Sequence, residues 1–267
     1  MQPLLFTVAL FAYLVVASAR LPGLWSPPSW LGAVGRVALW VGAVAHIVGL
    51  GLLAMHQGGP PVLAAGGTLV TLAAFLGAAN VLMQRQPYGE ALSGVLGALS
   101  AAMLGLGMLL PQGSEPAPEA LASLWFPIHA AMILLGLLGF ALAFGVSALY
   151  LVVSGRLKAK RLGDLGRLPS IDALDALNTR FIVLGFLALT FGIAAGGLWA
   201  TSIPDRAPRL GPTVYVTVVL WGWYAAAVMV RVVGGWRGRL AAHFSLVGFL
   251  GLLVSLGSIV AISRGWH

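Results

Sequence analysis

The sequence predicts an all-α, polytopic integral membrane protein with about eight transmembrane helices and with both termini on the outer side of the membrane. Three observations support this fold class. Hydrophobic residues make up 60% of the 267 residues and charged residues only 8%, a balance that soluble domains do not have. Apolar runs of about 20 residues recur along the chain, and a helix of that length crosses a bilayer. Lysine and arginine also concentrate in alternate connections between these runs.

Turn-forming residues separate the predicted spans from one another. Proline and glycine are concentrated at residues 22–28, 58–61, 111–118 and 204–212, where they end helices or form turns. No separate soluble domain is recognisable, so residues 1–267 are expected to form a single membrane domain. The predicted spans are residues 3–19, 37–55, 62–83, 91–110, 125–154, 174–199, 213–233 and 240–262.

The distribution of positive charge predicts the orientation of the chain. With the N-terminus outside, 12 of the 15 lysines and arginines fall in connections or at helix ends on the inner side. Inner loops carry such an excess in membrane proteins, so both termini and the loops 56–61, 111–124 and 200–212 are placed outside. The inner residues are Arg20, Arg36, Arg85, Arg156, Lys158, Lys160, Arg161, Arg167, Arg180, Arg231, Arg237 and Arg239, and the outer ones are Arg206, Arg209 and Arg264.

The sixth predicted span has recognisable features at both ends. Ser170 can cap the helix, and Asp172 and Asp175 follow in its first turns, where carboxylates interact favourably with the free N–H groups and the positive end of the helix dipole. Near the other end, Gly192 and Gly196 form a GxxxG pattern. This pattern predicts that a neighbouring helix backbone approaches closely there.

Composition excludes several classes of function. The chain has no cysteine, which excludes disulfides, CxxC redox chemistry and thiolate ligation of haem or zinc. All seven aspartates and glutamates fall in loops or at helix ends, which disfavours an ion-coupled carrier built on intramembrane carboxylates. The net charge of +8 is spread over the loops, so we expect membrane lipid around the protein and no nucleic-acid partner.

Histidines are the residues best placed for chemistry. His46 lies in the middle of the second predicted span, where a polar ring costs free energy unless it has a partner. Two interpretations of His46 stay open, namely a hydrogen bond to a neighbouring helix and ligation of a metal or haem iron. His129 lies at the outer end of the fifth span, and His267 is the last residue, just beyond the outer end of the eighth.

The two outer histidines, His129 and His267, are predicted at the ends of different helices on one face of the membrane. Two imidazoles on opposite sides of a planar haem form a bis-histidine site when apolar and aromatic walls surround them. Trp199 and Trp266 are expected at the same depth as these histidines. The alternative interpretation of the tryptophans is the aromatic belt of any membrane protein.

Short motifs in the second half of the chain resemble a known family. These are Arg167-Leu168-Pro169 with Asp172, Gly185-Phe186, Leu189-Thr190, Gly197 to Ala200, and Gly265-Trp266-His267. They resemble the cytochrome c assembly membrane family, which includes CcsA, CcmC and HemX-like proteins, and the family-like core covers residues 125–267. One segment differs, because the chain reads TSIPDRAPRLGPTVYV where full members carry a tryptophan-rich WGxxWxWDPKE loop.

The resemblance implies a protein that binds or conveys haem toward the outer face of the inner (plasma) membrane during c-type cytochrome biogenesis. It implies His129 and His267 as outer axial ligands of haem b, and His46 with Met229 as an inner-membrane haem site. The implied partners are other cytochrome c assembly proteins or an apocytochrome. Two roles stay open for this chain, namely a carrier or presenter of haem and a part of a haem lyase system. Two alternatives stay open: a HemX-like membrane regulator of haem synthesis, and a structural or assembly subunit without haem.

Overall fold

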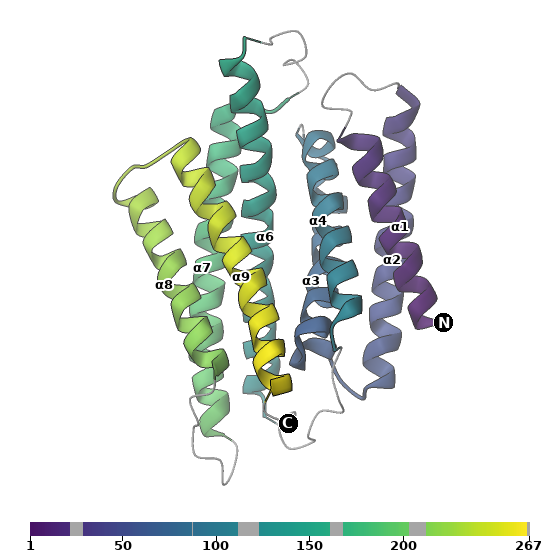
Figure 1. Ribbon diagram of the computed structural model, residues 1–267, viewed down its shortest axis with the longest axis vertical. Helices are drawn as coiled ribbons and strands as arrows, with labels where there is room; N and C mark the ends of the chain where they lie inside the picture. The colour runs from purple at the N-terminus through teal and green to yellow at the C-terminus, as the bar shows by residue number, and fades with distance from the viewer. Residues whose placement is uncertain (22–28, 87, 112–122, 161–167, 203–211, 266–267) are drawn as a thin grey trace.

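The computed structural model describes residues 1–21, 29–86, 88–111, 123–160, 168–202 and 212–265 of the chain (Figure 1). Within these residues, eight long α-helices run alternately up and down the bundle. A 3-10 turn, Pro61–Leu63, precedes the third helix. The helices are α1 (Gln2–Arg20), α2 (Ser29–His56), α3 (Ala65–Met83), α4 (Gly89–Leu109), α6 (Trp125–Lys158), α7 (Ile171–Thr201), α8 (Pro212–Val232) and α9 (Arg239–Gly265).

The expected multi-pass, all-α architecture is confirmed. Seven of the described helices are long and apolar enough to cross a bilayer, and the searched part of α9, Arg239–Ser255, is a shorter apolar helix. Each of the eight predicted spans corresponds to one of the helices in the described residues. The chain is therefore a multi-pass membrane protein.

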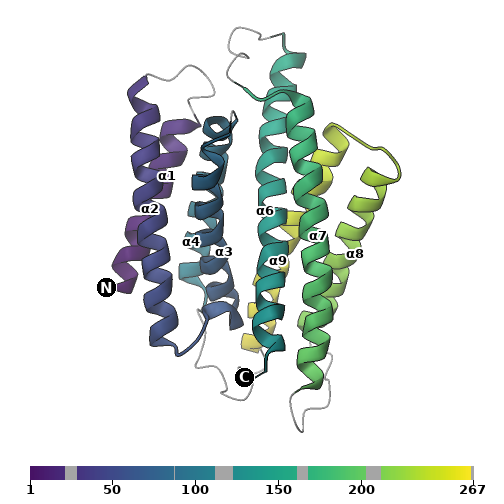
Figure 2. The ribbon, with the colours of Figure 1, turned by 180° about the vertical axis from the view of Figure 1, so that it is seen from behind.

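The helices form two groups of four in chain order, α1–α4 and α6–α9 (Figures 1 and 2). In the first group, α1 packs on α2 and α4, and α3 packs on α2 and α4. In the second group, α6 packs on α7 and α9, and α8 packs on the same two helices. The groups meet mainly where α3 and α4 face α6, for example at Gly145 of α6, which lies against Leu96 of α4.

The N-terminus and the end of α9 lie at the same end of the bundle (Figure 1). The ends of α2, α4 and α7 lie there too, as an even number of crossings requires. Arg20, Arg85, Lys158 and Arg231 lie in or just after the last turns of α1, α3, α6 and α8, at the opposite end. This second end is called the inner end below and the first the outer end, because lysine and arginine mark the inner side of a membrane protein.

The start of α2 differs most from the predicted boundaries. The sequence predicts a span from residue 37, because Arg36 carries a charge that is costly inside a bilayer. In the structure α2 already begins at Ser29, and Arg36 lies on it as an exposed residue close to the inner end. Its Nη1 atom is 3.5 Å from Glu90 Oε1 of α4, so the charge is exposed and paired and the helix continues through it.

Glycines allow α6 and α7 to pack closely along their length. A Cβ atom at Gly139 of α6 would lie 2.8 Å from the Cα atom of Gly185 of α7. Closer to the outer end, a Cβ atom at Gly192 of α7 would lie 3.0 Å from the backbone nitrogen of Ile133. The close approach that the GxxxG pattern predicts is therefore confirmed.

Candidate functional site

His129 lies at the outer end of the α6–α7 pair, where α7 makes room for its ring. His129 Nδ1 is 2.7 Å from the carbonyl oxygen of Gly192. A Cβ atom at Gly196 would lie 2.6 Å from His129 Nδ1 and 2.8 Å from its Cε1, so a side chain there would collide with the imidazole. The two glycines of the GxxxG pattern therefore form the seat of His129.

The hydrogen bond to Gly192 determines which nitrogen of His129 carries the proton. A carbonyl oxygen only accepts, so Nδ1 carries the proton and donates it. In the neutral ring, Nε2 then keeps its lone pair, and within the described residues nothing donates a hydrogen bond to it. Metal-binding histidines are commonly held in this way, with one N–H on a backbone carbonyl and the other nitrogen free for the metal.

Aromatic rings from both helices surround His129. Its ring stacks on the Trp199 ring of α7, with the ring centroids 5.7 Å apart and the planes at 24° to each other. The Trp199 ring also packs against the Phe126 ring of α6, with a centroid distance of 5.1 Å. Ser123 Oγ and Ser202 Oγ, 2.8 Å apart, join the outer ends of the same two helices. This arrangement places a half-buried imidazole against an apolar aromatic wall, which suits a flat apolar ligand with a metal at its centre.

His46 is completely buried midway along α2. Its Nδ1 atom is 3.3 Å from the Tyr13 hydroxyl oxygen of α1, and its ring meets the edge of Phe6 at a centroid distance of 5.6 Å. The ring also lies near the backbone of Val70 on α3, but Nε2 has no hydrogen-bond partner among the described residues. Because the exposed fraction of His46 is 0%, a porphyrin has no room beside it, and this packing favours the hydrogen-bonded interpretation.

Removal of the Tyr13 hydroxyl is expected to destabilise the first helix group. Tyr13→Phe leaves the buried His46 ring without its hydrogen-bond partner, which costs about 1–3 kcal/mol of unfolding free energy. Thermal unfolding in detergent measures this loss. Tyr224→Phe is the matched control, since the Tyr224 hydroxyl is buried without a partner among the described residues and its removal should cost nothing. An equal loss in both variants would contradict the role of the His46 hydrogen bond.

Met229 and His46 are not brought together within the chain. Met229 lies on α8 with 59% of its surface exposed, whereas His46 is enclosed by the first helix group. The helices that carry them, α8 and α2, lie on opposite sides of the bundle (Figures 1 and 2). An inner-membrane haem site made of these two side chains is therefore not formed in this structure.

The second predicted outer ligand, His267, and its neighbour Trp266 lie outside the described residues. Helix α9 reaches Gly265 at the outer end of the bundle, which is also the end that holds His129 (Figure 1). Of the predicted outer set, the described structure brings His129 and Trp199 together. The role of His267 stays a prediction.

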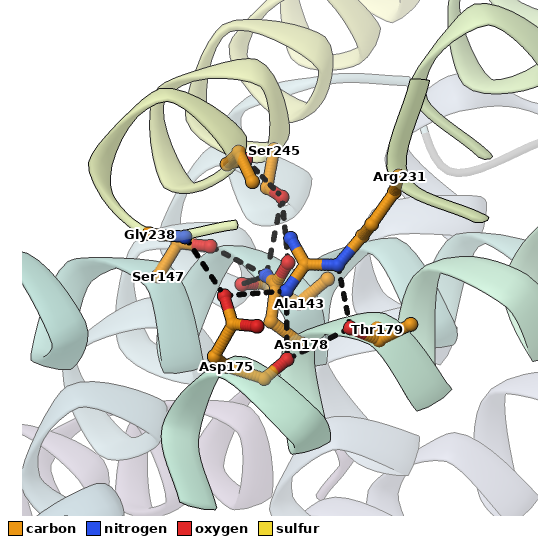
Figure 3. Close-up of polar contacts among 9 residues, drawn as sticks. Ala143, Ser147, Asp175, Asn178, Thr179, Arg231, Gly238 and Ser245 are labelled. Carbon is orange, nitrogen blue, oxygen red and sulfur yellow. Dashed lines mark hydrogen bonds and ion pairs between the residues drawn. The ribbon is translucent and has the colours of Figure 1, made fainter. Parts of the chain in front are cut away.

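An ion pair that the sequence analysis does not predict joins the inner ends of α7 and α8 (Figure 3). Arg231 Nη2 is 2.7 Å from Asp175 Oδ1, and the same carboxylate oxygen accepts from Gly238 N at 3.1 Å. Arg231 Nε donates to Thr179 Oγ1 at 2.5 Å. The sequence does contain a signal for this pair. Asp175 and Arg231 are ionisable residues near the inner ends of two apolar spans, and such residues need a charged or polar partner.

A buried amide lies next to this ion pair and joins α7 to two further helices (Figure 3). Asn178 Nδ2 donates to Ala143 O at 3.0 Å and to Ser147 Oγ at 2.6 Å, both on α6. Ser245 Oγ of α9 donates to Asn178 Oδ1 at 3.3 Å. Interhelical hydrogen bonds of this kind stabilise helix association inside a membrane, so this cluster supports the second helix group.

The described side chains hold no group of three or more His, Cys, Asp or Glu residues that could bind a metal ion. The chemistry of the outer site therefore depends on a single fixed imidazole, to which a second ligand from elsewhere would add. Such a site can bind a metal that already has an equatorial ligand, and haem iron is such a metal.

The fold and the outer site together define a multi-pass helical membrane protein that holds one imidazole, hydrogen-bonded through Nδ1, against aromatic rings at one end. A family model described as cytochrome C assembly protein matches residues 34–267 of the chain. The chain therefore belongs to the cytochrome c assembly protein family. The match extends well into the first half, where the motif resemblance is weaker than over residues 125–267.

Similar curated proteins carry the name cytochrome c biogenesis protein CcsA. The one from Parasynechococcus marenigrum is 30% identical over 201 residues, which cover 64% of this chain and 66% of that protein. The one from Prochlorococcus marinus is 27% identical over 182 residues, 58% of each chain, and the one from Gloeothece citriformis is 33% identical over 104 residues, 39% of this chain and 32% of that protein. The chain thus spans just under two thirds of the length of the first relatives.

Proposed function

We propose that this protein takes part in cytochrome c assembly by holding haem b at the outer end of its helix bundle, with His129 as one axial ligand. Haem is the cargo in this proposal, and the protein is a carrier or presenter in the plasma membrane. Its partners are other cytochrome c assembly proteins or an apocytochrome, which receives the haem. Family membership and the names of the relatives support the process, and the outer site supports the role of His129.

The seat of His129 is the observation that carries the proposal. The Gly192 carbonyl fixes the imidazole in the tautomer that leaves Nε2 available, and Trp199 provides a flat apolar surface beside it. The chemistry of these donors fits haem, because an axial ligand of haem iron is a neutral imidazole in an apolar pocket. His267, which follows α9 in the chain, is the proposed second axial ligand.

We assign His46 a packing role, because its ring is enclosed in the first helix group and contacts the Tyr13 hydroxyl. The ring packs against Phe6 and Tyr13, whereas Met229, the methionine expected to pair with it, lies on α8 in the other helix group. A haem between α2 and α8 would require the two helix groups to separate. The function is therefore placed at the outer end of the bundle alone.

The visible spectrum of the purified protein tests the proposal. We expect an intact protein in mild detergent to show a sharp Soret band and, after reduction, the separate α and β bands of low-spin haem. His129→Ala should remove these bands, because the alanine side chain cannot ligate iron. A colourless wild-type protein, even after expression with excess haem, would reject the proposal.

Two other histidines serve as controls for His129→Ala. His56 is exposed at the outer end of α2, so His56→Ala removes an imidazole from the same side of the bundle without touching the site. His46→Leu should lower the thermal stability and leave the haem spectrum unchanged, since His46 is a buried hydrogen-bonded residue. A spectrum that changes with His46→Leu and not with His129→Ala would place the haem in the first helix group.

A further inference from the structure

The turn between α8 and α9 brings three arginines together at the inner end of the second helix group. Arg231 ends α8, Arg237 lies in the turn and Arg239 begins α9. The turn is fixed in place, because Asp175 binds both Arg231 and the backbone nitrogen of Gly238. This carboxylate contacts the Arg231 side chain and the backbone between Arg237 and Arg239, while Asp172 lies exposed about one turn earlier on α7.

Arg231 has one nitrogen that the described part of the protein does not use. Its Nε atom donates to Thr179 and its Nη2 atom to Asp175, but Nη1 is buried and has no acceptor among the described residues. The Arg231 side chain is only 4% exposed, and Figure 3 shows it lying between α7 and α9. A buried guanidinium N–H without an acceptor is unfavourable, so an acceptor from outside the described chain is expected.

A small hollow lies beside the Arg231 side chain. Its walls come from three helices and the turn, and Arg231 is the charged residue among them; the others are Ile182, Ala227, Val230, Trp236, Ala241 and Phe244. The hollow itself has room for about one water molecule, so a larger group would bind at its mouth, where Trp236 is 45% exposed.

The first turn of α9 lies beside the same hollow, because Ala241 of this turn is one of its lining residues. Ala242 N donates to Gly238 O, so the backbone N–H groups of residues 239–241 precede the first helical acceptor of α9 and have none within the helix. No acidic residue lies in the first turn of α9 to neutralise them. A helix N-terminus with free N–H groups attracts a negative group, and Ala241 of this turn lines the hollow.

We propose that the hollow beside Arg231 and the first turn of α9 together bind the phosphate of an anionic phospholipid from the inner leaflet. Arg231 Nη1 reaches the phosphate through one water in the hollow, the α9 N-terminus supplies N–H donors, and Arg237 and Arg239 supply positive charge beside them. The exposed apolar side chains of Val232, Val233 and Leu240 lie beside it, where an acyl chain would run. Anionic lipids are concentrated at the inner surface of the membrane, which is the side that the positive charge of this protein indicates.

Lipid binding by the intact protein tests this proposal. In detergent, phosphatidylglycerol should bind the wild-type protein more tightly than phosphatidylcholine, and the double variant Arg237→Ala with Arg239→Ala should weaken phosphatidylglycerol binding by about 10- to 30-fold. Both arginines are exposed and lie outside the Asp175 ion pair, so the fold should remain intact, as an unchanged unfolding midpoint without added lipid would show.

The matched control removes two inner charges far from the turn. Arg36→Ala with Lys158→Ala changes the net charge by the same amount, and both side chains lie on other helices. Equal weakening by the two double variants would show that binding depends on total charge only and would overturn the site. Inorganic phosphate that displaces phosphatidylglycerol at millimolar concentration would overturn the lipid assignment in favour of a free anion.

Discussion

Gly196→Ala is expected to displace the His129 ring and to abolish the low-spin haem spectrum of the outer site. The new methyl group would lie 2.6 Å from His129 Nδ1, and the neighbouring Gly192 carbonyl would lose its hydrogen bond as the ring moves away. Overpacking of this kind also costs about 1–3 kcal/mol of unfolding free energy. The reduced visible spectrum and the thermal unfolding midpoint measure the two effects separately.

Gly197→Ala is the matched control for this change. It adds the same methyl group one residue along the same helix, at a position where, apart from the adjoining backbone of α7, no atom of the described residues lies within 4 Å of the new Cβ. We expect it to leave the spectrum unchanged and to stabilise α7 slightly, because alanine has the higher helix propensity. If both variants lose the haem bands, helix flexibility and not the seat of His129 determines haem binding.

Asp175→Ala is expected to cause the largest loss of stability among single changes in the second helix group. It leaves the buried Arg231 charge without its carboxylate and the Gly238 N–H without its acceptor. Breaking one side of a buried ion pair costs about 3–5 kcal/mol. Thermal unfolding in detergent should show a large fall of the midpoint.

Two further variants distinguish the ion pair from a general effect of charge. Asp172→Ala removes an exposed carboxylate from the first turn of the same helix and should cost less than about 1 kcal/mol. The double variant Asp175→Leu with Arg231→Met removes both charges and should recover part of the loss, since no unpaired charge remains. A double variant that is less stable than Asp175→Ala would contradict this account of the pair.

Most of the fold follows from the sequence because each span carries its own hydrophobic signal. The eight predicted spans, the common side of the N-terminus and the end of the last helix, and the close approach at Gly192 are all found in the described structure. Ser170 Oγ accepts from Ala173 N at 3.2 Å, as its predicted capping role requires. The start of α2 is missed, because the partner that makes Arg36 acceptable on a helix, Glu90, lies 54 residues away in the chain.

The candidate site is predicted only in part, since its geometry depends on contacts between distant residues. His129 and the GxxxG glycines are both recognisable in the sequence, but nothing in their spacing shows that the glycines hold the histidine. The sequence predicts that His46 has a hydrogen-bond partner or a metal, but only the structure identifies Tyr13 as the hydrogen-bond partner. Considered alone, Asp175 is a carboxylate that interacts with the dipole of its helix, and Arg231 is one of the positive charges that orient the chain in the membrane. In the structure the two form a buried ion pair.

The division of the bundle into α1–α4 and α6–α9 has a consequence for biosynthesis. Each group of four is continuous in the chain, and α1 and α2 have few contacts with the second group. A ribosome completes the first four helices before α6 emerges, so the His46–Tyr13 contact can form while the second half is still being translated. The seat of His129 lies between α6 and α7, which follow each other in the chain, so this seat can form as soon as that hairpin has been inserted. The proposed second ligand, His267, is translated later, so the outer site is completed only after α9.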